Sequence, residues 1–244
     1  MPLASARSLS TKRLVANYDP YSAYLDLALP FDARNSIADI SARIKGGGYT
    51  HPMRSNAGTI STAISKYYGS SFLGGQPDGS TARLVASAVG PFRTADFCIE
   101  TWVYIPSPLP VDNFCIFYHH FDTNAGFVIL VLGSAASPSS AVYFGGGASA
   151  DAAHSSSSLV LDAWNHIAVT RSGSTLRIFV NGNYDVVYGG TVYSDWTHGP
   201  AGGYILNSLG TAGDNIRLQD YRIYKGTPKY TANFTPPGQM IQTP

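Results

Sequence analysis

The stretch "FCIETWVYI" at residues 97–105 is the strongest indicator of the fold in this sequence. Successive strand residues point to opposite faces of a sheet, so its odd-numbered residues share one face and its even-numbered residues share the other. Pro106 follows, and proline cannot continue a central ladder because it has no N–H to donate. The stretch therefore predicts a sheet strand that ends before Pro106.

The segment "WNHIAVTRSGSTLRIFVNGNYDVVYGG" at residues 164–190 predicts three more strands joined by two tight turns. The second turn is Asn181-Gly182, and both residue types tolerate the positive φ that a type I′ hairpin turn requires. This turn sets the register of the strand before it. The residues expected to face inward are Leu176, Ile178 and Val180, and those expected to face outward are Arg177 and Phe179.

The rest of the chain has the same character. Apolar runs at residues 24–32, 114–121, 126–133 and 141–147 alternate with clusters of Gly, Pro, Asn and Ser, and no stretch keeps a helical period. We interpret "KGGG" at 45–48, "GGGAS" at 145–149 and "HSSSS" at 154–158 as loops. The 244 residues predict an all-β protein, a single antiparallel β-sandwich.

Charge and hydropathy exclude several partner classes. The net charge is +1, which gives no general field for nucleic acid or an anionic membrane. No run reaches the roughly 18 apolar residues that a membrane-spanning helix needs. The N-terminus lacks the apolar core of a secretory signal, so we expect synthesis in a cytosol, with Cys98 and Cys115 buried and unpaired.

Three segments carry a family resemblance: "DFCIETWVY", "WNHIAVTRSGSTLRIFVNG" and "YRIYKGTPKYTANFTPP". Together they resemble the laminin G-like, concanavalin A-like jelly rolls. The resemblance covers a jelly-roll domain at residues 14–237 and leaves a tail at 238–244. The first thirteen residues are small, polar and basic, and we interpret residues 1–13 as an extended N-terminal arm. The resemblance also implies that the last strand returns beside the first, and that "TPKYTANFTPP" crosses the surface, where its prolines blunt a sheet edge.

Glu100 is the residue to consider as a catalytic carboxylate. The superfamily includes glucanases, which the resemblance implies use two or three carboxylates on one strand, and glycoside cleavage generally needs two about 5–9.5 Å apart. Glu100 is the only glutamate in the chain, and Cys98, Trp102 and Tyr104 fill the other positions on its strand face. We therefore interpret Glu100 as structural and expect no enzyme activity. His166, in the "W-x-H" motif, is likewise interpreted as a packed structural residue.

We expect no cofactor, and calcium is the one metal left open. The loop residues of the right type are Asp78, Asp151, Asp214 and Asn215. These are also ordinary turn residues. Consecutive strand residues face opposite ways, so His119 and His120 cannot jointly bind one ion.

A glycine-rich segment at residues 187–207 is the predicted glycan-binding surface. Aromatic rings cover the apolar face of a sugar while polar groups fix its hydroxyls. The residues concerned are Tyr188, Tyr193, Asp195, Trp196, His198 and Tyr204. Two alternatives stay open: the aromatics pin a long loop, or they contact a protein.

The closing "RIYKG…YT…FxPP" pattern resembles that of bacteriophage structural proteins. It implies a non-enzymatic virion protein, a head decoration or tail component made in the host cytoplasm, whose partners are other virion proteins and a cell-surface glycan. We expect Arg7, Lys12 and Arg13 of the arm to anchor it to the particle, the alternative being an ordinary frayed terminus. A free lectin, a glycan-cleaving enzyme and a homo-oligomer are alternatives left open.

Overall fold

The computed structural model describes residues 19–55, 58–74, 83–86, 89, 92, 94–119, 126–146, 151–188, 203–208 and 215–240. Strands form nearly all of the regular structure in these ranges. The helices are a 3-10 turn, η1 (Ser22–Tyr24), and a short α-helix, α1 (Ser41–Lys45). No helix in this part of the chain is long and apolar enough to cross a membrane. The predicted all-β class is confirmed.

The first sheet has eight antiparallel strands. Its order is β13-β12-β11-β6-β15-β4-β3, and β1 also pairs with β15. In that order the bounds are Asn183–Tyr188, Thr175–Val180, Trp164–Ser172, Phe97–Tyr104, Arg217–Lys225, Ser71–Leu73 and Thr59–Ser61, with β1 at Leu25–Leu29.

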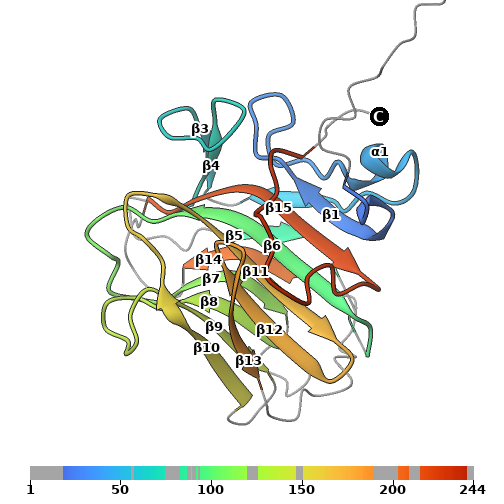
Figure 1. Cartoon of the computed structure of the whole chain (residues 1–244). Coiled ribbons are helices and arrows are strands. Elements are labelled where there is room, and N and C mark those ends of the chain that lie inside the picture. The colour runs from blue at the N-terminus through green and yellow to red at the C-terminus, as the bar shows by residue number, and fades with distance from the viewer. Residues whose placement is uncertain are drawn as a thin grey trace, which may run out of the picture.

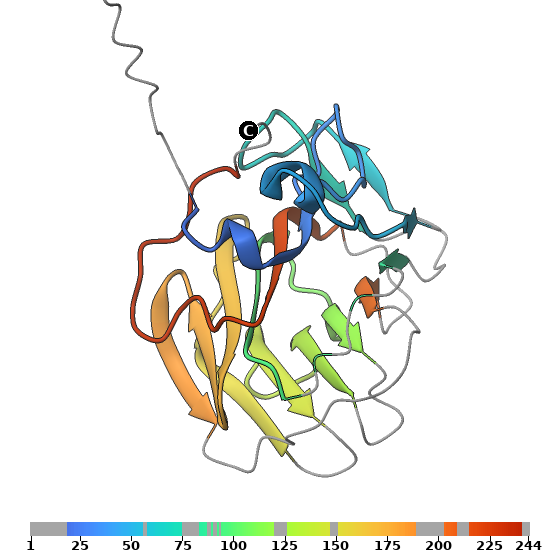
Figure 2. The same cartoon turned by 90° about the vertical axis from the view of Figure 1, so that its right-hand side faces the viewer.

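The second sheet has seven antiparallel strands in the order β10-β9-β8-β7-β14-β5-β2. In that order the bounds are Asp151–Ser158, Ala141–Gly146, Phe127–Val131, Phe114–His119, Gly203–Ser208, Arg83–Ala86 and Met53–Ser55. The two sheets stack face to face, as Figures 1 and 2 show. The predicted sandwich is therefore the observed architecture.

One apolar core fills the space between the sheets. Phe127 lies near its centre, with its ring within 5.5 Å of the Phe97, Phe117 and Phe144 ring centroids. The predicted inward residues of 176–180 line this core, while Phe179 packs on the opposite face of its sheet. The odd-numbered face of residues 97–105 also meets this core. The φ angles at the 181–182 turn are 51° and 80°, as the hairpin prediction requires.

Both cysteines are buried and unpaired, as expected. Cys98 lies on β6 of the first sheet and Cys115 on β7 of the second.

The closing segment, residues 226–240, crosses the outer face of the first sheet (Figure 1). The predicted return of the last strand is confirmed, because β15 pairs with β1. However, β15 itself lies inside the sheet between β6 and its partners β1 and β4, and the segment mainly covers a face. Its contact with a sheet edge is at β13, where Asn233 Oδ1 accepts the Tyr184 N–H at 2.7 Å. Packing continues to Met240, which is 6% exposed.

Two predicted loops are strands. Residues 145–146 belong to β9, and residues 154–158 belong to β10. In β10 small side chains alternate in burial: Ala153 and Ser155 face inward while His154 and Ser156 are exposed. Ser155 is satisfied there because its hydroxyl accepts the Val142 N–H and donates to the Ser157 carbonyl. Hydrophobic alternation could not reveal a strand whose inward residues are alanine and serine.

Candidate functional site

Glu100 lies on the outward face of β6 and is only 1% exposed. The closing segment covers it: Lys229 donates to its Oε1 at 2.8 Å and the Tyr230 hydroxyl donates to its Oε2 at 2.7 Å. Arg222 Nη1, from β15, lies 3.6 Å from the same carboxylate. These three partners are consistent with the predicted structural role of Glu100.

Further ionisable groups join Glu100 to form what we call the polar hub. Its members are Asp19, Glu100, His166, Asp220, Arg222, Tyr224, Lys229 and Tyr230. Asp19 accepts hydrogen bonds from Lys229, at 3.2 Å, and from the Tyr224 hydroxyl. Asp220 accepts from Tyr68 and from the Met240 N–H. Residues from both ends of the described chain therefore meet over the first sheet.

Reasoning along one strand missed Asp19 and Asp220 as neighbours of Glu100. Asp19 contacts the same ammonium group as Glu100, and Asp220 contacts the same guanidinium. No local sequence pattern predicts these contacts, because they form only when segments distant in the sequence fold onto β6. Within the hub, the carboxylates of Asp19 and Glu100 both accept from Lys229 Nζ, which lies between them.

The charge state of Glu100 argues against acid catalysis. Burial raises its pKa, but Lys229, His166 and Arg222 outweigh burial and hold the pKa well below its usual range. A general acid in glycoside cleavage needs the opposite, a raised pKa. Glu100 therefore works as a buried anion that binds the closing segment.

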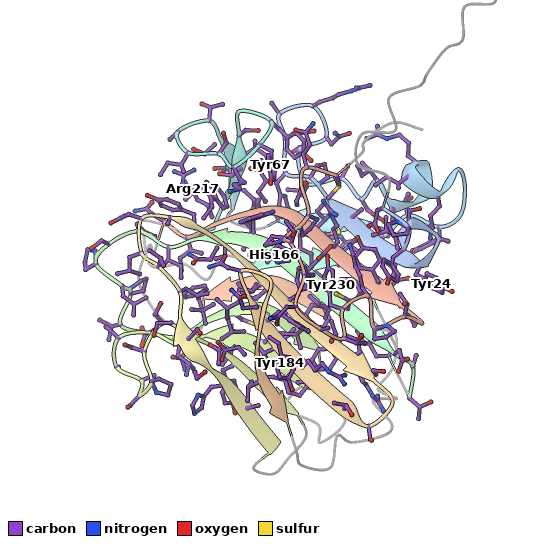
Figure 3. All side chains as sticks on the ribbon, viewed as in Figure 1. Tyr24, Tyr67, His166, Tyr184, Arg217 and Tyr230 are labelled. Atoms are coloured by element: carbon purple, nitrogen blue, oxygen red, sulfur yellow. The ribbon has the colours of Figure 1, made fainter. Side chains whose placement is uncertain are left out.

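His166 packs under this segment, as its structural interpretation predicts. It is 1% exposed, its ring lies 5.2 Å from the Trp102 ring and 5.7 Å from the Phe234 ring, and its Nε2 lies 3.4 Å from Glu100 Oε2. Burial lowers its pKa even though Glu100 acts in the opposite direction. Figure 3 shows His166 and Tyr230 over the middle of the first sheet.

The predicted glycan-binding residues do not form one loop. Tyr188 ends β13 in the first sheet, and Tyr204 lies in β14 of the second sheet, paired with β5 and β7. Tyr193, Asp195, Trp196 and His198 lie outside the described residues. This surface stays a prediction.

The calcium candidates are similarly divided. Asp78 and Asp214 lie outside the described residues, Asp151 begins β10, and Asn215 is exposed at a φ of 47°. Within the described ranges, no group of three or more His, Cys, Asp or Glu residues is arranged to hold a metal ion.

A second feature of the outer face is an aromatic shelf, consisting of Tyr67, Trp102, Tyr104 and Trp164. Trp164 on β11 pairs with Tyr104 on β6, and their ring centroids lie 5.7 Å apart. Two residues earlier on β6, Trp102 meets the Tyr67 ring at 6.2 Å. Tyr67, Tyr104 and Trp164 are half-buried, so part of each ring faces solvent.

Two cations flank the aromatic shelf. Lys66 Nζ lies 4.1 Å from the Trp102 ring centroid, and Arg217 on β15 pairs with Tyr104. Gln219 fixes the loop that carries Lys66, because its Oε1 accepts the backbone N–H groups of Lys66 and Tyr67, both at 2.7 Å. The shelf was missed in the sequence because its residues come from three separated segments. The Trp164, Tyr104 and Arg217 row follows only from the pairing of three strands.

Solved structures with a similar fold include the binding domains of a mosquitocidal protein and of a botulinum neurotoxin. The binding domain of the Paraclostridial Mosquitocidal Protein 1 aligns with a TM-score of 0.62 at 14% identity, over 84% of this chain and 49% of that one. The binding domain of botulinum neurotoxin DC in complex with rat synaptotagmin II aligns with a TM-score of 0.58 at 16% identity, over 84% and 48%. The same toxin's domain in complex with SialylT gives 0.57 at 18% identity, over 83% and 48%.

These identities establish a shared fold, and the chain spans about half the length of the structures it matches. No curated protein sequence matches the chain. A family model described as the concanavalin A-like lectin/glucanases superfamily, of the laminin G type, matches residues 78–228, more than half of the 244 residues. The chain belongs to the concanavalin A-like lectin/glucanase superfamily.

Proposed function

We propose that the chain is a non-enzymatic, lectin-like module that binds glycans on the outer face of its first sheet. The observation that carries this proposal is the aromatic shelf, where partly exposed rings lie beside cations and amide groups. Such rings suit the apolar face of a pyranose, and the polar groups suit its hydroxyls. The predicted surface at residues 187–207 is kept as a second glycan-binding surface.

The polar hub supports a binding role over a catalytic one. Glu100 is buried and ion-paired with Lys229, so no substrate reaches it while the closing segment is in place. Two of the solved toxin domains are in complexes, one with SialylT and one with rat synaptotagmin II, and this chain matches about half the length of each.

A glycan array with the purified chain tests this function. Trp164→Ala should weaken glycan binding by more than about tenfold, the usual effect of truncating a central aromatic contact. The matched control is Tyr49→Ala, which removes an aromatic that is 60% exposed and lies outside the shelf. Binding lost in Trp196→Ala but kept in Trp164→Ala would place the site at residues 187–207. No binding to any glycan would refute the lectin role.

We also propose that the module is a bacteriophage structural protein, a head decoration or tail component, made in the host cytoplasm. This rests on the resemblance of its closing pattern to such proteins. Mass spectrometry and imaging of purified particles should find the chain and locate it. Absence from the particles would favour a free lectin.

In this proposal the arm with Arg7, Lys12 and Arg13 anchors the module to neighbouring virion proteins. A chain beginning at Leu14 should keep the melting temperature of the full chain but fail to rebind particles that lack the protein. Equal attachment of both chains would place the anchor on the sandwich.

A further inference from the structure

Arg217 is a buried cation without a counter-charge among the described residues. It is 6% exposed, and its Nη1 makes a long polar contact, 3.5 Å, with the Ser71 hydroxyl. Its Nε has no hydrogen-bond partner. Burying an unpaired charge costs free energy, so a buried guanidinium normally has a carboxylate beside it. An anion bound at this place would offset the cost.

Other donors on the same face also lack partners. The indole Nε1 atoms of Trp102 and Trp164 are buried and form no hydrogen bond. In the described part of the chain Lys66 pairs with no carboxylate, and its ammonium group rests on the Trp102 ring. The shelf is therefore rich in donors and cations and poor in acceptors.

We infer that the aromatic shelf binds an acidic saccharide, with Lys66 and Arg217 recognising its carboxylate and Tyr104 and Trp164 contacting the sugar ring. This inference rests on the proposed glycan-binding function and names the class of glycan. Arginine and lysine both donate to carboxylates, and the charge makes these hydrogen bonds stronger than neutral ones.

Within the described ranges, one carboxylate contacts the shelf, and its position indicates how the ligand is oriented. Asp162 Oδ1 accepts the Ser107 N–H at 3.0 Å and lies 3.5 Å from the Tyr104 hydroxyl. It precedes Trp164 by two residues, whereas Arg217 lies on the other side of β6. The acidic group of the ligand therefore belongs at the Arg217 side, away from Asp162.

A paired-ligand experiment tests this specificity. Binding of oligogalacturonate and of 3′-sialyllactose is compared with binding of carboxyl-reduced oligogalacturonate and of lactose, at low and high salt. We expect the wild-type chain to bind at least one acidic member about tenfold more tightly than its neutral counterpart, and to lose this preference at high salt.

The variants separate charge from ring contact. Lys66→Gln and Arg217→Gln should each reduce binding of the acidic ligand about three- to tenfold without changing binding of the neutral one, while Lys66→Arg keeps the preference. Trp164→Ala should reduce both. Lys45→Gln, which removes an exposed cation at the end of α1, should change neither. Thermal melting checks that each variant is folded, and Lys66→Gln suffices should Arg217→Gln not fold.

The outcomes distinguish this inference from the proposed function. Equal binding of acidic and neutral members, both weakened by Trp164→Ala, overturns the acidic specificity and keeps the lectin role. Acidic preference unaffected by Lys66→Gln and Arg217→Gln places recognition elsewhere and overturns the assignment. Binding of neither ligand class, here and on the glycan array, overturns both proposals.

Discussion

At the level of single residues, Glu100 has the largest expected effect on stability. Its carboxylate neutralises Lys229 and Arg222, so Glu100→Gln leaves buried cations with less counter-charge. Breaking a buried pair in this way costs about 3–5 kcal/mol of unfolding free energy. Chemical denaturation measures the loss, with the exposed Asp112→Asn as a control that should stay within about 0.5 kcal/mol. A loss below about 1 kcal/mol for Glu100→Gln would contradict the structural role.

His166 should make stability depend on pH in a specific window. Because burial lowers its pKa below the ordinary 6.5, the unfolded chain takes up a proton that the folded chain resists. Stability should therefore fall as pH drops below about 6.5, by at most about 1.4 kcal/mol per pH unit for this one group.

Asp220 acts in the opposite direction over part of this range, because burial raises its pKa to about 6 and its protonation stabilises the fold. The effect of His166 must therefore be separated from that of Asp220. We compare the melting temperatures of the wild-type chain and His166→Gln at each pH from 5 to 8, and the change of their difference with pH measures the contribution of His166. Parallel curves would show that His166 does not contribute.

At the level of elements, the 181–182 turn holds the closing segment. Gly182 has a φ of 80°, its carbonyl accepts the Phe234 N–H at 2.9 Å, and an added Cβ would lie 2.0 Å from the Phe234 carbonyl oxygen. Gly182→Ala should thus cost about 1–2 kcal/mol for the backbone conformation and about as much again for the displaced hydrogen bond and Phe234 packing.

Gly173→Ala is the matched control, because Gly173 also has a positive φ, 59°, but an added Cβ there meets nothing within 4 Å. Urea unfolding should show the larger loss for Gly182→Ala, and hydrogen exchange should show faster exchange of the Phe234 amide. Equal losses in the two variants would mean that the closing segment adapts without cost.

The sequence predicted those elements whose side chains alternate between apolar and polar or small. Residues 97–105 were correctly divided into two faces by their alternation, and residues 176–180 were placed on the correct faces because the turn fixes the register. β10 was missed because alanine and serine face the core there. The contacts of Asp19 and Lys229 with Glu100, and the shelf row, depend on which distant strands pair, and no local pattern contains that information.

At the level of the whole molecule, the polar hub ties the chain ends to the middle of the sandwich. Asp19 precedes β1, Lys229 follows β15, and both contact each other over β6. The outer face of the first sheet therefore has two parts. The closing segment covers its centre, and the aromatic shelf lies beside that segment, toward the β3–β4 hairpin, as the labels of Tyr67 and Arg217 in Figure 3 show.

This division predicts that the molecule binds glycans without cleaving them. Cleavage needs a protonated carboxyl group and a second carboxylate at an accessible bond, but Glu100 is buried and held ionised, and Asp19 is bound to the same Lys229. Among the described residues, Asp162 is the carboxylate that contacts the shelf. Incubation with β-glucans, alginate and host polysaccharide should therefore release no reducing ends. Release of reducing ends that persists in Glu100→Gln would point to an acid–base pair elsewhere. If Glu100→Gln abolishes the release while thermal melting shows an intact fold, the closing segment must open to admit substrate to the hub.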